Sequence, residues 1–139
     1  MTILVINCGS SSIKFKLFSS DISHVMAEGI VERVGEACGR VDYRAFPGAS
    51  DEKRVESEQQ VPDHGSGLQL VVDMLTGKSH GVISGRDQIK AVGHRVVHGG
   101  EHFHAPTLID EASILRIESV NSLAPLHNPA NMKGIAVSR

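Results

Sequence analysis

The 139 residues include 14 Lys and Arg against 16 Asp and Glu, giving a formal net charge of -2, and 40% of the side chains are hydrophobic. This balance is that of an ordinary folded domain with one core. A near-neutral chain lacks the basic face that attracts nucleic acid or anionic membrane, so neither is expected as a partner. No apolar run approaches the roughly 20 residues that span a bilayer, and no signal-peptide pattern is visible, which predicts a cytoplasmic protein.

The two cysteines fit the same compartment. Cys8 and Cys38 are too few for a disulfide framework and form no CxxC pair, so reduced thiols are expected. Cys8 is a conceivable nucleophile, but a free cysteine is more often a small buried side chain. We therefore expect Cys8 to pack in the core.

The first half of the chain has the pattern of an antiparallel sheet. Residues 2–7 form a continuous apolar run, and residues 13–18 alternate between apolar and lysine side chains. Together they predict a hairpin with a long loop of Gly and Ser. Shorter alternation within 24–34, 39–46 and 53–61, separated by Gly, Pro and Asp, predicts further strands.

The second half mixes helices with one strand. Apolar residues within 63–76 fall at spacings of three and four, and Gly77 follows as a stop, which predicts a helix. Residues 89–97 are strand-like, 110–119 predict a helix with acids in its first turn, and 129–139 open another helix with a proline near its start. The whole order predicts an α/β (α+β) fold. The last pattern ends without a cap, and the sequence leaves open whether residue 139 is a natural end.

The stretch "VINCGSSSIKFKLF" is suited to phosphate. Consecutive amides in a Gly and Ser turn form a concave anion site, and Ser10, Ser11 and Ser12 add hydroxyl donors. Asn7 offers a neutral oxygen for a hydrated magnesium ion, and Lys14 a compact positive charge. A plain serine-rich hairpin turn remains an equal alternative, because Gly, Ser and Asn also make turns for local reasons.

Two other phosphate motifs fail. The "TGKS" at 76–79 matches the end of a P-loop, but Val72 stands where the first glycine is required, and a helix precedes it instead of a strand. No GxGxxG occurs, so a dinucleotide fold has no support. We expect 76–79 to be the end of a helix.

A second cluster is "AVGHRVVHGG", residues 91–100. Arg95 interrupts an apolar strand-like run, where a permanent charge is costly unless a carboxylate or phosphate pairs with it. The partner is either a ligand carboxylate or an internal Asp or Glu, and the sequence leaves both open. Val96 and Val97 are strand core by default, although a small valine-lined pocket would suit a short acyl chain.

Several histidines follow in the same region. His94, His98, His102 and His104 suggest a metal site, but residues four apart on a strand lie about 13 Å from each other, too far to share an ion. Structural roles are therefore expected for them. His127, in a proline-rich turn, is either structural or a donor to a phosphoryl oxygen.

Three segments resemble signatures of one family. "INCGSSSIKF", "VGHRVVHGGEHF" and "SLAPLHNPAN" occur in the order found in the acetate kinase family, part of the larger group of folds that includes sugar kinases, actin and heat-shock ATPases. The resemblance runs from Met1 to Arg139. It implies the N-terminal domain of that fold, a mixed sheet that opens with a phosphate-binding β-hairpin and is flanked by helices.

The resemblance also implies a reaction and its site residues. The reaction is transfer of the ATP γ-phosphoryl group to acetate, giving acetyl phosphate and ADP with magnesium as cofactor. The matched positions imply Asn7 for magnesium, Ser10, Ser12 and Lys14 for the ATP phosphates, Arg95 for the acetate carboxylate, Val97 and Leu126 for the methyl pocket, and His127 for the phosphoryl group in transfer.

Family members are considerably longer than this chain. The resemblance implies that residues 1–139 are an incomplete N-terminal domain, that a catalytic aspartate and an adenosine-binding C-terminal domain lie outside it, and that the full-length enzyme is a homodimer. The 139 residues alone are expected to be inactive. Two alternatives stay open: a propionate or butyrate kinase, since one methylene is worth only about 1–3 kcal/mol, and a non-catalytic fragment that binds phosphate or dimerises.

Overall fold

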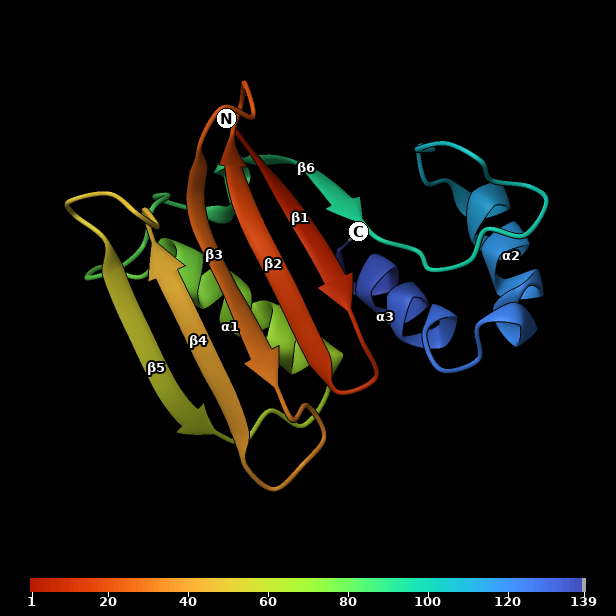
Figure 1. Ribbon diagram of the computed structural model, residues 1–139, viewed down its shortest axis with the longest axis horizontal. Helices are drawn as coiled ribbons and strands as arrows, with labels where there is room; N and C mark the ends of the chain where they lie inside the picture. The colour runs from red at the N-terminus through yellow and green to blue at the C-terminus, as the bar shows by residue number, and fades with distance from the viewer. Residues whose placement is uncertain (139) are drawn as a thin grey trace.

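The computed structural model describes residues 1–138 as a six-stranded sheet with three α-helices (Figure 1). The strand order is β5-β4-β3-β2-β1-β6, and only the β1 to β6 pair is parallel. The expected mixed α/β class is confirmed. The bounds are β1 Thr2–Cys8, β2 Ser12–Ser19, β3 Val25–Glu32, β4 Gly39–Ala45, β5 Lys53–Gln59, α1 His64–Thr76, β6 Ile89–His94, α2 Glu111–Ser119 and α3 Asn128–Ser138.

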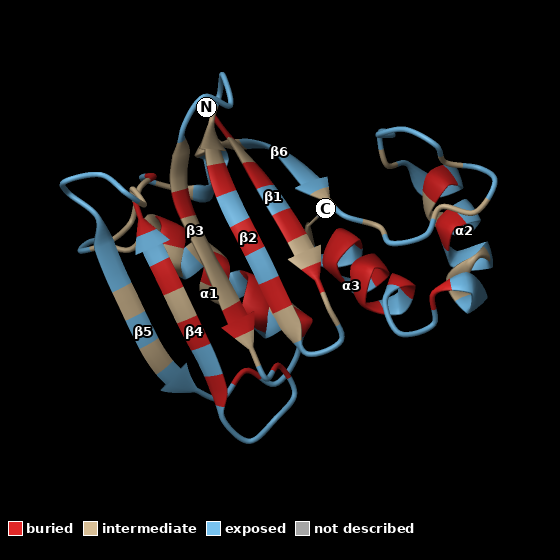
Figure 2. Cartoon of the chain, viewed as in Figure 1, coloured by how far each residue is buried: buried red, intermediate tan, exposed pale blue. Residues whose placement is uncertain are grey.

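One face of the sheet carries the core. Side chains of period two on β1 and β2, such as Leu4, Ile6, Phe15 and Leu17, are buried, and α1 and α3 cover them side by side. The intervening side chains point to the opposite face, which no helix in residues 1–138 covers. Figure 2 shows this as alternating buried and exposed bands on β2. The sheet therefore has one closed and one open face, as expected for alternating strands.

Helix α1 begins and packs as its sequence predicts. The carboxylate of Asp63 caps the helix by accepting from the amide of Ser66 at 2.7 Å, which satisfies one free donor of the first turn. Leu68, Val71 and Leu75 are buried against the sheet. No helix within residues 1–138 combines the length and apolarity needed to cross a bilayer.

Two boundaries differ from the sequence prediction. The expected strand over 89–97 ends at His94, although β1 continues to Cys8. The last ladder bond runs from the Arg95 amide to the Ile6 carbonyl at 3.1 Å, and the amides of Val97 and His98 bind side chains of α3 instead of β1. Val96 and Val97 are therefore not strand core. The expected long hairpin loop is also short: only residues 9–11 separate β1 from β2, because the ladder continues to the pair Cys8 and Ile13.

Gly134 lets α3 approach the sheet closely. A Cβ atom at this position would lie 2.2 Å from Nε2 of His94 and 2.6 Å from Sγ of Cys8. We expect Gly134→Ala to lower the free energy of unfolding by about 1–3 kcal/mol, since inserting a methyl group into a filled core forces neighbours to move. Urea unfolding measures it, with the exposed Lys133→Ala on the same helix as control. Equal stability of the two variants would contradict this packing.

The two thiols should differ sharply in reactivity. Cys8 is fully buried, and burial raises its pKa to about 11, whereas Cys38 is exposed. Since the thiolate is the reactive form, iodoacetamide at pH 8 should label only Cys38 in the folded protein and both thiols in urea. Mass spectrometry of the peptides reads the result. Rapid native labelling of Cys8 would show that this end of β1 is accessible. The expectation of a packed Cys8 thiol is confirmed by its burial.

Candidate functional site: the Gly-Ser hairpin and the open-face cavity

The Gly-Ser hairpin, residues 9–12, is held through its carbonyl groups. The Gly9 carbonyl lies 2.6 Å from Nε2 of His64 on α1, and the Ser11 carbonyl accepts from the Val34 amide at 2.9 Å. Inside the turn, the Gly9 amide donates to the Ser12 carbonyl at 2.8 Å. The turn is thus fixed from the α1 and β3 sides, on the carbonyl side of the backbone.

The donors of the same hairpin are left open. Within residues 1–138 the amides of Ser10 and Ser11 donate to no backbone carbonyl, and the hydroxyls of Ser10 and Ser12 have no partner. A Cβ atom at Gly9 would lie 2.8 Å from the Ser12 hydroxyl oxygen, so a side chain there would crowd these donors. The result is a short run of free donors at an exposed turn, the kind of nest that binds an anion.

A cavity of about 530 Å³ lies on the open face beside this hairpin. Asn7 and Lys14 stand opposite each other on β1 and β2, and Arg95 follows the end of β6. All three line the cavity. The structure therefore brings together three of the site residues predicted from sequence, one from each of three neighbouring strands or strand ends.

Most charged residues that line this open-face cavity are paired with one another. Glu28 on β3 accepts from Lys16 at 3.0 Å and also from Arg44 on β4. Asp42, beside Arg44 along β4, binds Arg54 of β5 at 2.8 Å, and that partner holds the pKa of the Asp42 carboxyl below its usual value. These pairs neutralise the part of the cavity over β3 to β5.

The charges at the β1 end of the cavity have no such partners. Lys14 and Arg95 form no ion pair in residues 1–138, and the side chain of Asn7 forms no hydrogen bond there. The internal salt bridge considered for Arg95 is thus not formed within these residues. The expectation of a buried Arg95 inside a strand is wrong, since its side chain is exposed just beyond β6. Two uncompensated positive charges and a free amide therefore face the same cavity.

The backbone at Arg95 is fixed although its side chain is free. Its amide donates to β1, and its carbonyl oxygen lies 2.7 Å from Nδ1 of His94, which donates to it. Burial lowers the pKa of His94, so this neighbour is neutral near pH 7. The guanidinium thus extends from an anchored main chain.

The other predicted site residues lie outside the open-face cavity. Val97 and Leu126 are surface side chains, 38% and 74% exposed, and His127 is exposed at the start of α3. None of the three lines the cavity. Their assignment to a methyl pocket and to the phosphoryl group remains a prediction.

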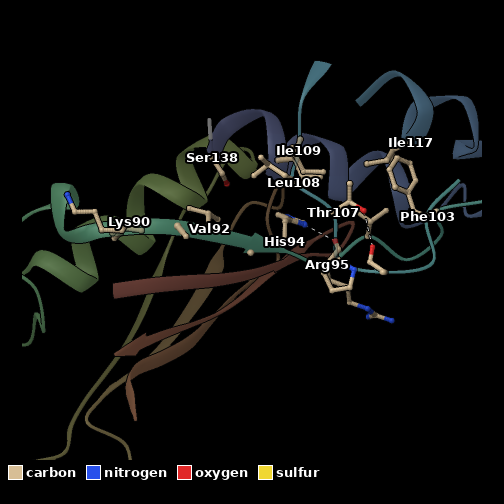
Figure 3. A pocket seen from close by; sticks show the side chains of 18 residues that line it. Lys90, Val92, His94, Arg95, Phe103, Thr107, Leu108, Ile109, Ile117 and Ser138 are labelled. Atoms are coloured by element: carbon tan, nitrogen blue, oxygen red, sulfur yellow. Dashed lines mark hydrogen bonds between the residues drawn. The ribbon is translucent and has the colours of Figure 1, made fainter. Parts of the chain in front are cut away.

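A larger groove of about 750 Å³ runs along the outer edge of β6. Figure 3 shows that apolar side chains, including Val92, Phe103, Ile109 and Ile117, dominate its wall, while the Arg95 guanidinium points away from them. Only Arg95 among the predicted site residues lines it. We therefore place the candidate chemistry in the smaller cavity on the open face, which Asn7, Lys14 and Arg95 line together.

Sequence reasoning missed three buried polar side chains near this site. His64, Asn128 and Asn131 are buried polar side chains that bind backbone groups near the hairpin or near Arg95. The two asparagines lie in the "LHNPAN" segment that carries the resemblance, so a signal was present for them. His64 had none, since only the fold brings α1 to the turn.

Solved structures of known enzymes share this fold. The chain superposes on an acetate kinase from Porphyromonas gingivalis with a TM-score of 0.90 and 37% identity, covering 98% of this chain and 33% of that one. A propionate kinase from Francisella tularensis gives a TM-score of 0.82 at 33% identity, over 98% of this chain and 33% of that one. The fold is thus that of a third of a known acetate or propionate kinase, and the expected fold class is confirmed.

Sequence relatives point to one family. The chain is 45% identical to acetate kinase of Helicobacter hepaticus over 139 residues and 47% identical to that of Halothermothrix orenii over 137, covering 100% and 99% of this chain. The model of the acetokinase family matches residues 2–139. The chain belongs to the acetokinase family, and it spans about a third of the length of these relatives.

Proposed function

We propose that the protein carrying this chain transfers the γ-phosphoryl group of ATP to acetate, producing acetyl phosphate and ADP, and that residues 1–139 are part of its N-terminal domain. One observation carries the proposal. The other lysine and arginine of the open-face cavity, Lys16 and Arg44, are paired with Glu28, whereas Lys14 and Arg95 have no ion-pair partner within residues 1–138. Unpaired cations beside free turn donors suit two anions, a phosphate chain and a carboxylate.

Each residue then has a simple role. The planar guanidinium group of Arg95 binds the acceptor carboxylate through two parallel hydrogen bonds. The Gly-Ser hairpin and Lys14 bind the phosphates of ATP. Phosphoryl transfer depends mainly on alignment and on neutralising charge at the transferred group. His127 donates to an oxygen of that group, and Val97 and Leu126 contact the methyl group, in an arrangement completed by residues outside this chain.

Magnesium fits this site only together with nucleotide. In residues 1–138 no three His, Cys, Asp or Glu side chains form a metal-binding group, and Asn7 offers one unpaired amide oxygen beside two cations. A magnesium ion keeps several waters and takes few protein ligands, so Asn7 would hold the hydrated ion of MgATP. When bound, that ion offsets the charge of the phosphates.

The resemblance to the acetate kinase family and the free cysteines suggest the compartment, the missing domain and the oligomeric state of the proposed enzyme. Two free cysteines, one of them exposed, suit the reducing cytoplasm. The adenosine site and the catalytic aspartate belong to the C-terminal part of the protein, and the working unit is a homodimer. A fragment that only dimerises would need neither unpaired cation, and one that only binds phosphate gives no reason for a separate arginine suited to a carboxylate, so we rank both below the enzyme.

The preferred carboxylic acid distinguishes the two candidate reactions, phosphorylation of acetate and phosphorylation of propionate. The likeness to a propionate kinase makes propionate the second candidate acceptor. ADP release by the whole protein, measured with saturating MgATP and increasing acetate, propionate or butyrate, gives kcat/KM for each acid. We expect the highest value for acetate. Absence of acid-stimulated ADP release with all three would contradict the proposed function.

Substitutions at the residues proposed to bind MgATP should change the kinetics without changing the stability of the protein. We expect Lys14→Ala and Asn7→Ala in the whole protein to raise the KM for MgATP roughly 10- to 100-fold, because each removes one contact to a charged group, worth about 1.5–3 kcal/mol. Both side chains lie on the open face, so the Tm should change little. Magnesium titration of activity and thermal unfolding measure the two effects. A large fall in Tm with normal kinetics would favour the plain-turn alternative.

A further inference from the structure

Two asparagines near the start of α3 are among the few buried polar side chains. Asn128 and Asn131 are 0% and 1% exposed. A buried amide is costly unless its oxygen and its NH₂ group both find partners, and each of these amides binds backbone groups with both ends. Their partners lie in segments that are distant in sequence, around Cys8 and around His98.

Asn131 joins two of these segments to each other. Its Nδ2 donates to the Cys8 carbonyl at 2.7 Å, and its Oδ1 accepts from the Val97 amide at 3.1 Å. Cys8 immediately precedes the Gly-Ser hairpin, and Val97 lies two residues after Arg95. Figure 1 shows α3 beside the end of β1 and the chain that leaves β6.

Asn128 makes a more local contact. Its Oδ1 accepts from the His98 amide at 3.1 Å, and its Nδ2 donates to the carbonyl of the same residue at 2.8 Å. It therefore fixes the chain after Arg95 to α3 without touching β1. The two asparagines share helix, burial and chemistry, but only Asn131 spans two segments.

The position of this contact gives it a role. The backbone ladder between β1 and β6 stops with the bond from the Arg95 amide to the Ile6 carbonyl. Beyond it, no backbone hydrogen bond in residues 1–138 joins the segment that follows β1 to the segment that follows β6. Beyond the end of the ladder, the two hydrogen bonds of Asn131 connect these segments, between the Gly-Ser hairpin and Arg95. In-line transfer tolerates little displacement, since 1 Å of misplacement costs roughly 100-fold in rate.

We propose that Asn131 is a positioning residue that sets the spacing between the Gly-Ser hairpin and Arg95, and thereby aligns donor phosphate and acceptor carboxylate. The inference rests on the proposed function. Loss of the Asn131 contact should lower kcat more than it raises either KM, because each substrate keeps its own contacts while their mutual alignment is lost.

Matched variants separate this role from a general contribution to folding. In the whole protein, Asn131→Asp and Asn128→Asp each keep an acceptor oxygen for the amide and remove one donor to a buried carbonyl. We expect similar losses of Tm. We expect kcat for acetyl phosphate formation to fall roughly 100-fold in Asn131→Asp and less than threefold in Asn128→Asp. Equal kcat values in the two variants would overturn the positioning role.

Amide hydrogen exchange gives a second readout that does not depend on activity. In the unmodified protein the Val97 amide should exchange slowly although it lies outside any strand, and Asn131→Asp should leave the hairpin strands protected. A fast Val97 amide in the unmodified protein would overturn the proposal even if the variants do not fold. If the unmodified protein forms no acyl phosphate, the proposed function fails and the positioning role with it; normal activity with a fast Val97 amide defeats the positioning role alone.

Discussion

Replacing Arg95 by alanine in the whole protein should raise the KM for acetate roughly 10- to 100-fold and also lower turnover. The reason is the loss of a charge-assisted contact to the carboxylate, worth about 1.5–3 kcal/mol. Arg95 has no internal partner in residues 1–138, so its removal leaves no unpaired acid behind. Stability should therefore change little, and the kinetic loss can be assigned to the substrate.

Two companion variants sharpen this test. Arg95→Lys should recover only part of the loss, because an ammonium group cannot reproduce the planar fork of a guanidinium. Arg116→Ala, an exposed arginine on α2, changes the net charge equally and should leave acetate kinetics as they are. Steady-state assays over a range of acetate concentrations measure all three. An unchanged KM and kcat in Arg95→Ala would remove Arg95 from the acceptor site.

The 139 residues expressed alone should show no turnover. Phosphoryl transfer needs groups on both sides of the substrates, and this chain spans about a third of the relatives it matches. The contacts proposed between the Gly-Ser hairpin and ATP are hydrogen bonds in competition with water, each worth about 0.5–1.5 kcal/mol net, and the proposed adenosine site lies outside this chain. We therefore expect a Kd for MgATP in the millimolar range or weaker, about -4 kcal/mol or less favourable.

Calorimetry with MgATP and a hydroxamate assay for acetyl phosphate test the two halves of that expectation. The same assays on the whole protein are the control. Micromolar affinity, or any acetate-dependent product from the purified 139 residues, would show that the groups assigned to the rest of the protein are dispensable.

Much of the fold follows from local pattern. Alternation places Phe15 and Leu17 inward and Lys14 and Lys16 outward, which defines both faces of the sheet before any contact is known. Asp63 and Asp110 begin their helices as N-caps, in agreement with capping preferences. These features depend on neighbours in sequence, so the sequence predicts them well.

The site itself depends on contacts that no local pattern contains. The apolar run through Val97 predicts strand, but the strand stops at His94 because the amides of Val97 and His98 bind Asn131 and Asn128 instead of β1. The pairing of Lys16 and Arg44 with Glu28 is likewise invisible in the sequence. That pairing is what distinguishes the two free cations of the cavity from the neutralised ones.

Phosphorus NMR of the whole protein with MgATP and acetate tests the proposed reaction most directly. The signals of ATP should decline while those of ADP and acetyl phosphate grow in equal amounts, and Arg95→Ala at the same acetate concentration should slow this conversion at least tenfold. ATP consumption that yields inorganic phosphate without acetyl phosphate, or no acetate dependence at all, would contradict the assignment of Arg95 and the Gly-Ser hairpin to acyl phosphate formation.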